Sequence, residues 1–200
     1  GKTTNRFHVT MTTLRRVLEP DLPDEAPSSY ISRLGDTYRI ELGKEGWVDM
    51  HIFADELSRA RREENSHRAI RHHMEAVATY TGDLLAEAPF CEWCREIRRN
   101  LRKKYLDTLE SIITYFEMRS EFEKCIIYTE KYISVDRAAE KMYRKLMGFY
   151  AETGNPVQVR STLKRCRENL KKELDCPIEP RTEELARQLL SGENYSADLK

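Results

Sequence analysis

The chain has 200 residues, its 34 basic and 34 acidic side chains give a formal net charge of zero, and 40% of its residues are hydrophobic. This length and apolar content allow one or two domains with a real core, while the charge balance excludes an overall positive field that attracts nucleic acid. No window approaches the roughly 18 apolar residues that span a bilayer, and no signal-peptide core is present. The sequence therefore predicts a cytoplasmic protein without membrane contact.

The segment Asn5–Pro20, NRFHVTMTTLRRVLEP, has the pattern of one amphipathic helix closed by a proline. Its apolar side chains recur at steps of four, three and four and share one face: Phe7, Met11, Leu14 and Leu18. The opposite face is small, polar and basic. From residue 1 to residue 16 there are four Lys or Arg and no acid. This local bias could serve a negatively charged partner, or these charges could simply be solvated while the helix packs on the rest of the chain.

Residues 19–29 hold three prolines and four acids and predict a loop. The next run, YISRLGDTYRIEL, alternates around Gly35 and predicts two short strands joined by a tight turn. From Asp49 onward the apolar spacing is helical, with caps and breakers that mark each helix. The expected helices cover about 49–64, 66–80, 90–118, 120 onward, 136–154, 156–174 and 182–190.

The helical region is self-similar at a spacing of 34 residues, which is the tetratricopeptide period. The shift places Leu109 on Tyr143, Ile112 on Leu146 and the turn residue Ser120 on Gly154. An earlier helix pair fits the same frame after about 21 inserted residues near 82–104 are removed. The predicted fold is mainly α: a stack of three tetratricopeptide-like repeats with a capping helix, preceded by a helix and a β-hairpin.

The segments of this region resemble a known family. The stretches VDMHIFADELSRARRE, TYTGDLLAEAPFCEWCREIRRNLRKKYLDTLE and ENLKKELDCPIEPRTEELARQLL are similar to the bacterial transcriptional activator domain, the tetratricopeptide module of AfsR-like antibiotic regulators. The resemblance covers about 48–190. It implies a regulator that works by self-association or by contact with another protein.

The preceding part, FHVTMTTLRRVLEP followed by YISRLGDTYRIEL, resembles the recognition helix and the hairpin wing of an OmpR-type winged helix. That resemblance implies a helix that buries one stripe and presents the other face to the major groove of promoter DNA. The implied DNA contacts are Asn5, His8, Val9, Thr12, Thr13, Arg15 and Arg16 from the helix, with Arg33 and Thr37 from the wing.

Two observations suggest that the chain is part of a longer protein. It begins with Gly1, which indicates a fragment, a processed product or a tagged chain. The leading strands and first two helices of a winged helix are also not in this sequence. We therefore expect binding of double-stranded promoter DNA to require the complete winged helix.

The inner wall of a tetratricopeptide stack is lined by the first helix of each repeat, which predicts a groove for a peptide or a partner helix. The residues expected there carry mixed charges: Asp107, Glu110, Thr114 and Glu117 from one unit, with Lys141 and Arg144 from the next. Neighbouring charges could instead satisfy one another. A small effector in this groove is a third, weaker interpretation.

Other chemistry is not predicted. Cys91 and Cys94 lack the second ligand pair that a structural zinc site needs, and the five cysteines are an odd number in helical sequence, so we expect reduced thiols. His72 and His73 point about 100° apart on a helix, which favours a solvated face over joint metal ligation. No nucleophile motif or glycine-rich phosphate loop is present. We predict no catalytic residue, cofactor or metal.

The sequence therefore predicts a DNA-binding transcriptional regulator with three parts. Residues 1–43 form the C-terminal part of a winged helix, 47–191 form the activator domain and 192–200 form a tail. The alternative function is a tetratricopeptide adaptor that binds proteins and never contacts DNA.

Overall fold

The computed structural model describes residues 2–23, 26–35, 37–43 and 46–191, with side chains from Arg6 onward. The side chain of Asn5 and the predicted tail at 192–200 lie outside the described parts. Two compact units divide the chain, residues 1–48 and residues 49–200.

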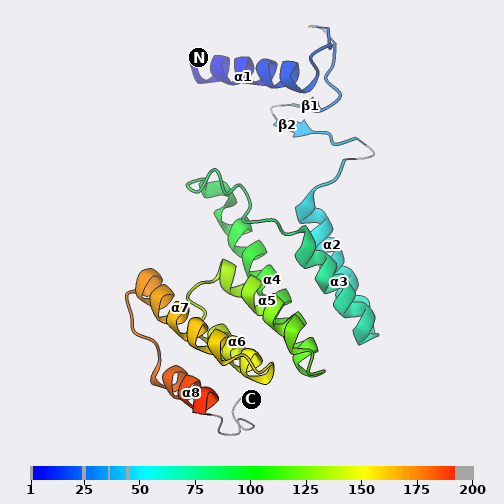
Figure 1. Cartoon of the computed structure of the whole chain (residues 1–200). Coiled ribbons are helices and arrows are strands. Elements are labelled where there is room, and N and C mark those ends of the chain that lie inside the picture. The colour runs from blue at the N-terminus through cyan, green and yellow to red at the C-terminus, as the bar shows by residue number, and fades with distance from the viewer. Residues whose placement is uncertain (1, 24–25, 36, 44–45, 192–200) are drawn as a thin grey trace. The chain divides into compact units, whose positions relative to one another are not determined.

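The first unit consists of a helix and a hairpin (Figure 1). Helix α1 covers Lys2–Leu18, and strands β1 (Ile31–Leu34) and β2 (Thr37–Ile40) pair antiparallel, with Ile31 opposite Ile40. Gly35 adopts φ +61° at the turn, a left-handed conformation that glycine reaches without steric cost. The predicted helix and hairpin are both confirmed.

Helix α1 contacts the hairpin through its apolar stripe. The rings of Phe7 and Tyr38 meet edge to face, with centroids 5.3 Å apart, and Ile31 is buried. The loop after the helix is fixed by Glu19, which accepts hydrogen bonds from the Ser28 hydroxyl and from the Ser29 backbone N–H. These bonds hold the pKa of Glu19 below its ordinary value. The contacts orient the helix so that its opposite face remains exposed.

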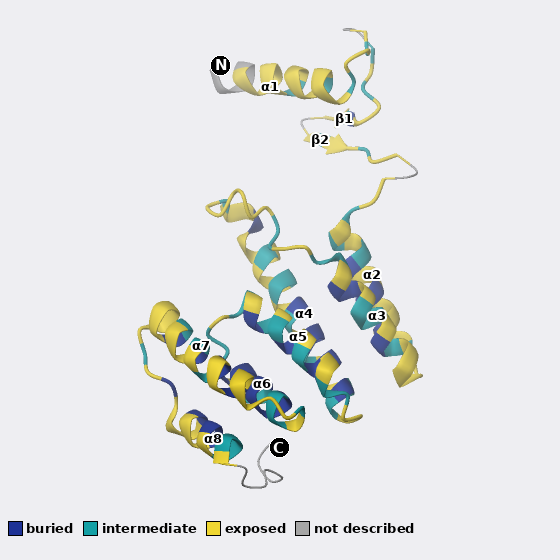
Figure 2. Cartoon of the chain, in the orientation of Figure 1, coloured by how far each residue is buried: buried dark blue, intermediate teal, exposed yellow. Residues whose placement is uncertain are grey.

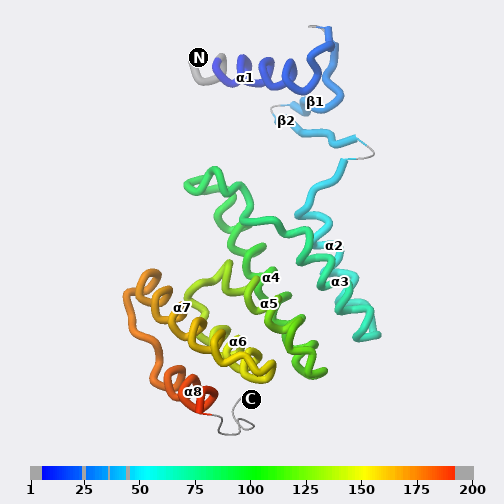
Figure 3. The backbone as a smooth tube through the Cα atoms, in the orientation of Figure 1, coloured from blue at the N-terminus to red at the C-terminus, as the bar shows by residue number. Residues whose placement is uncertain are grey.

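The second unit is a stack of antiparallel helices (Figure 3). Helix α2 pairs with α3, α4 with α5 and α6 with α7, while α8 packs on both α6 and α7. This order is the predicted arrangement of three helix pairs and a capping helix. The helices are α2 (Asp49–Arg62), α3 (Ser66–Thr79), α4 (Glu92–Glu117), α5 (Phe122–Val135), α6 (Glu140–Glu152), α7 (Pro156–Leu174) and α8 (Pro180–Ser191).

The turns of the stack repeat with the predicted period. Ser120 and Gly154, which are 34 positions apart, both have positive φ, at 55° and 69°. After the second turn, the Asn155 side chain accepts a hydrogen bond from the Gln158 N–H, and Pro156 occupies the first helical position. Helix α6 differs from the expectation, because Asp136 ends α5 and its carboxylate accepts from the Ala138 N–H, so the helix begins at Glu140.

The core lies between the helix pairs (Figure 2). Leu109 and its repeat equivalent Tyr143 are fully buried, as are Ile112 and Leu146. An α-helix that buries one stripe against its partner and another against the next pair cannot be stable alone. The 34-residue pattern is therefore a pattern of contacts between successive repeats.

The inserted segment between α3 and α4 is organised by one arginine. The guanidinium of Arg98 donates hydrogen bonds to the backbone carbonyls of Leu84, Leu85, Ala88 and Pro89, at 2.7 to 3.1 Å. Only a planar fork with several donors can satisfy so many carbonyls at once. This arginine thus fixes the loop that precedes α4.

None of the helices in the described part of the chain is long and apolar enough to span a membrane.

Because the core lies between the repeats, removal of a core side chain should lower the free energy of unfolding strongly. We expect Leu109→Ala to lower the free energy of unfolding by about 3 kcal/mol, because it leaves a cavity in a core that cannot fully collapse. Urea unfolding followed by circular dichroism measures the change. Met118→Ala, at a position that is 79% exposed, serves as the control and should change it by less than about 0.5 kcal/mol. Equal effects would contradict the assigned core.

Candidate functional site

The first candidate surface is the polar face of α1. His8, Val9, Thr12, Thr13 and Arg16 are all exposed. Their positions on the helix bring them to one side, opposite the stripe that contacts the hairpin. A helix of this kind leaves room for close approach by another molecule, because small side chains alternate with a cationic one.

The threonine hydroxyls of this face donate hydrogen bonds to the backbone of their own helix. Thr12 donates to the His8 carbonyl and Thr13 to the Val9 carbonyl, each at 3.0 Å. Such bonds to the preceding turn leave the methyl group and the oxygen lone pairs directed outward. The face therefore offers apolar contact and acceptors from threonine, and its strongest donor is the guanidinium of Arg16.

Arg15 differs from the other predicted contacts. It follows Met11 by one helical turn and lies at the edge of the apolar stripe, where it is half-buried. Its Nε is buried and has no hydrogen-bond partner among the described residues. Arg15 is thus directed partly inward, whereas Arg16 is exposed.

The two wing residues flank the turn of the hairpin and are exposed. Arg33 donates from Nε to the Gly35 carbonyl at 2.9 Å and lies over the Tyr38 ring, 5.9 Å from its centroid. The Thr37 hydroxyl donates to the Leu34 carbonyl at 2.8 Å. Both side chains therefore stabilise the turn as well as facing outward.

The second candidate surface is the predicted groove, in which some charges pair across the repeats. Lys141 reaches Glu110 at 3.4 Å. Glu117 pairs with Lys145, a residue that the sequence interpretation missed. The sequence could have indicated Lys145, because it follows Lys141 by one helical turn and therefore lies on the same face of α6. Thr114 is exposed.

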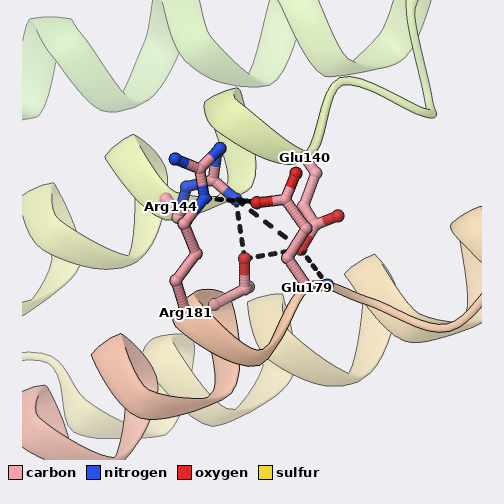
Figure 4. A network of polar contacts seen from close by, with 5 residues as sticks. Glu140, Arg144, Glu179 and Arg181 are labelled. Atoms are coloured by element: carbon pink, nitrogen blue, oxygen red, sulfur yellow. Dashed lines mark hydrogen bonds and ion pairs between the residues drawn. The ribbon is translucent and has the colours of Figure 1, made fainter.

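Arg144 does not meet the acids of the preceding unit as expected. It is only 14% exposed and lies against the segment that leads into α8 (Figure 4). Its guanidinium donates to Thr182 Oγ1 at 2.8 Å and pairs with Glu179 at 3.1 Å, and the Glu140 carboxylate accepts from the Glu179 N–H at 2.7 Å. The expectation was wrong because the sequence did not show that α8 would cover this face of α6.

One part of the inner wall remains open. A cavity of about 180 Å³ lies between α2, α3 and α4. Asp107, one of the predicted groove residues, lines it together with two cations, Arg61 and Lys104. Across the described ranges, no ion pair joins any of these three side chains to another residue. The remaining lining residues are Leu57, His73, Thr108 and Ser111.

His73 contributes a polar atom to this cavity wall. Its Nδ1 is buried and has no hydrogen-bond partner within the described part of the chain. Burial, together with the nearby His72 and the charge of Arg61, lowers the pKa of His73 below its ordinary value. The imidazole is therefore neutral at pH 7. The cavity thus combines two cations and one acid, which form no ion pair with the described residues, and a ring nitrogen that has no hydrogen-bond partner among them.

The cysteines do not form a reactive site. Cys94 is buried, and its thiol donates to the Cys91 carbonyl at 3.3 Å. Burial raises the pKa of Cys125 to about 11 and that of Cys166 to about 12, which keeps both thiols protonated.

Comparison with known proteins identifies the family of the second unit. The model of the bacterial transcriptional activator domain matches residues 48–190, which is more than two thirds of the chain. The chain belongs to this family. The resemblance seen in the sequence is thereby confirmed for the activator domain, and the chain is a member of a family of transcriptional regulators.

One solved structure, described as Mycobacterium tuberculosis EmbR in complex with a low-affinity phosphopeptide, is similar in fold. Its TM-score is 0.57 at 15% sequence identity, and the match covers 97% of this chain and 51% of that chain. The likeness shows the mainly helical fold alone, and the activator-domain chain spans about half the length of the EmbR structure. No curated protein matches the chain.

A substitution at Arg144 tests whether the contact between α6 and α8 stabilises the activator domain. We expect Arg144→Ala to lower the free energy of unfolding by about 3 kcal/mol, because it leaves the Glu140 carboxylate buried with fewer partners. Thermal and urea unfolding measure the change. Arg167→Ala removes another arginine that pairs with the α8 region, Glu183 at 2.9 Å, but this pair is exposed. It should cost less than about 1 kcal/mol. If Arg144→Ala costs no more than this control, the buried network does not hold α8.

Proposed function

We propose that the chain is part of a DNA-binding transcriptional regulator of the cytoplasm. Residues 1–43 act as the C-terminal part of a winged helix, and 47–191 act as the regulatory domain. The observation that carries this proposal is the division of α1 into two faces. One face contacts the hairpin through Phe7 and Tyr38, and the other is exposed, small and basic.

The exposed face suits the major groove of duplex DNA. A recognition helix needs small side chains for close approach and cations for the phosphates. Threonine methyl groups can contact the methyl group of thymine, and the Arg16 guanidinium can donate two hydrogen bonds to guanine or to a phosphate. We assign base or phosphate contact to His8, Val9, Thr12, Thr13 and Arg16, with Arg15 at the edge of this face and with Arg33 and Thr37 near the minor groove. Asn5, which the sequence also predicts as a DNA contact, lies outside the residues whose side chains are described.

The exposed apolar residues of the first unit support the same function. Phe7, Leu14 and Leu18 of the stripe remain 48%, 37% and 43% exposed, whereas Met11 is half-buried. Apolar side chains in one stripe are typical of a surface that packs on a further element. The missing strands and helices of a winged helix would cover such a stripe, and this agrees with a DNA-binding domain that is completed by further sequence.

We further propose that the activator domain contacts a protein partner or a second copy of itself through the inner wall of the stack. The cavity of Arg61, Lys104 and Asp107 carries charges of both signs that form no ion pair with any described residue, and they complement a polar segment of a partner. Glu110 and Lys141 continue this wall, whereas Arg144 is committed to α8. The EmbR structure, whose description names a bound phosphopeptide, supports a protein partner for this chain.

The DNA proposal is tested with the polypeptide extended at its amino end to complete the winged helix. Duplexes selected from a random pool should bind with an affinity that falls linearly as salt rises on logarithmic axes. Arg16→Ala should weaken binding and reduce this slope by about one, because one phosphate contact is lost. Fluorescence anisotropy at several salt concentrations measures both.

Arg71→Ala is the matched control for this experiment. Arg71 is exposed on α3 and reaches only Glu75, at 4.0 Å, so its removal should leave affinity and slope unchanged. If no duplex is selected, the chain is a protein adaptor without DNA binding. If a duplex binds but Arg16→Ala behaves as Arg71→Ala does, the assigned face of α1 does not contact DNA.

The partner proposal is tested by photo-crosslinking in cells. A photoreactive amino acid at Ser111, which lines the cavity, should form a crosslinked product of defined mass that contains the partner. Lys104→Glu should reduce its yield at least threefold by reversing a charge of the wall. The same amino acid at Lys164, exposed on α7, provides the control. Equal crosslinking at both positions would contradict a specific groove.

A further inference from the structure

A histidine and two glutamates converge where α2 packs on α3. Glu56 comes from α2, and His72 and Glu75 come from successive turns of α3. One donor atom from each of the three residues lies within 4.8 Å of the other two. His72 Nδ1 is 2.7 Å from Glu56 Oε2 and 3.9 Å from Glu75 Oε2. The sequence alone does not show this group, because Glu56 lies 16 residues before His72 and meets it only when α2 packs on α3.

We propose that Glu56, His72 and Glu75 form a binding site for a divalent transition-metal ion, with Zn²⁺ as the best fit. Imidazole nitrogen and carboxylate oxygen are ligands that zinc accepts, at about 2.0 to 2.2 Å in tetrahedral geometry. Two carboxylates and a neutral imidazole neutralise the ion. A water molecule supplies the fourth ligand, since Glu75 is exposed and gives access to solvent.

The neighbouring charges leave the required atoms available. Arg59 pairs with Glu56 through the other carboxylate oxygen, Oε1, at 2.7 Å. Arg71 approaches Glu75 at Oε1 as well, at 4.0 Å. In both glutamates Oε2 is therefore the oxygen directed at His72. These contacts are of the kind that orients the ligands of a metal site from outside.

The ionisation state of the buried glutamate agrees with this geometry. Burial would raise the pKa of Glu56, but the hydrogen bond with His72 and the charge of Arg59 outweigh it, so the pKa lies below its ordinary value. Glu56 thus remains a carboxylate at neutral pH. When the ion binds Nδ1, the proton between Nδ1 and Glu56 is released to solvent, and the imidazole carries its one remaining proton on solvent-accessible Nε2, which keeps that proton or takes one up from water.

The expected effect of the ion is to join α2 to α3. This pair forms the first repeat and contacts the rest of the stack only through α3 and α4, among the closely packed elements of the described chain. An ion bound by both helices stabilises the folded pair by mass action. The inference is independent of DNA binding and of the groove, because these residues belong to neither surface.

Calorimetric titration of the whole chain with ZnCl₂, after removal of metals with a chelator and in a non-thiol reductant, tests the site. The wild type should bind one equivalent, and zinc should raise its melting temperature. His72→Ala and Glu75→Gln should each weaken binding at least tenfold. Glu75→Gln is the decisive variant, because it changes one exposed atom and leaves the fold intact, whereas a change at Glu56 affects a buried contact.

Two controls separate this site from other zinc ligands. His51→Ala removes an exposed histidine of α2 that is outside the group, and Cys91→Ser removes a partly exposed thiol. Both should bind zinc as the wild type does. The proposal is overturned if the wild type shows no binding, if binding survives in His72→Ala and Glu75→Gln, or if it is lost in Cys91→Ser.

Discussion

Burial of side chains between successive helix pairs is the interaction on which the second unit depends. Leu109, Ile112, Tyr143 and Leu146 occupy equivalent positions 34 residues apart, and all four are fully buried. No helix pair can bury its two apolar faces alone, so each pair needs its neighbour. The same constraint explains α8, which covers the outer face of the last pair. It also explains why the inner wall stays free to carry charge.

The charges of the stack divide according to their burial. Glu140 and Arg144 are buried at the contact with α8, where hydrogen bonds to Thr182 and to the backbone of Glu179 offset the cost of removing them from water. Around Asp107 the wall is open, and its charges form no ion pair within the part of the chain that the structure describes. The first arrangement stabilises the end of the stack, and the second is available for recognition. The sequence pattern placed Arg144 and Asp107 in one class, and the structure separates them.

The first unit differs from the second, because it has few internal contacts and many exposed apolar side chains. The edge-to-face contact of Phe7 with Tyr38 and the hydrogen bonds of Glu19 fix α1 on its hairpin. These contacts determine which face of the helix is presented outward. In the proposed regulator, that orientation is what allows Arg16 to approach a phosphate while the stripe packs on the rest of its domain.

The sequence by itself determined the elements and their period. Turn residues and apolar spacing are local signals, so the helix, the hairpin, the repeat of 34 and the family of residues 48–190 could all be read from it. Only the tertiary structure decided which charges meet. The burial of Arg144 under α8, the pairing of Lys145 with Glu117 and the convergence of Glu56 with His72 depend on how helices distant in sequence pack together. The partner of a side chain across such a contact depends on how whole helices are rotated and shifted relative to one another. A local sequence pattern does not predict that rotation or shift.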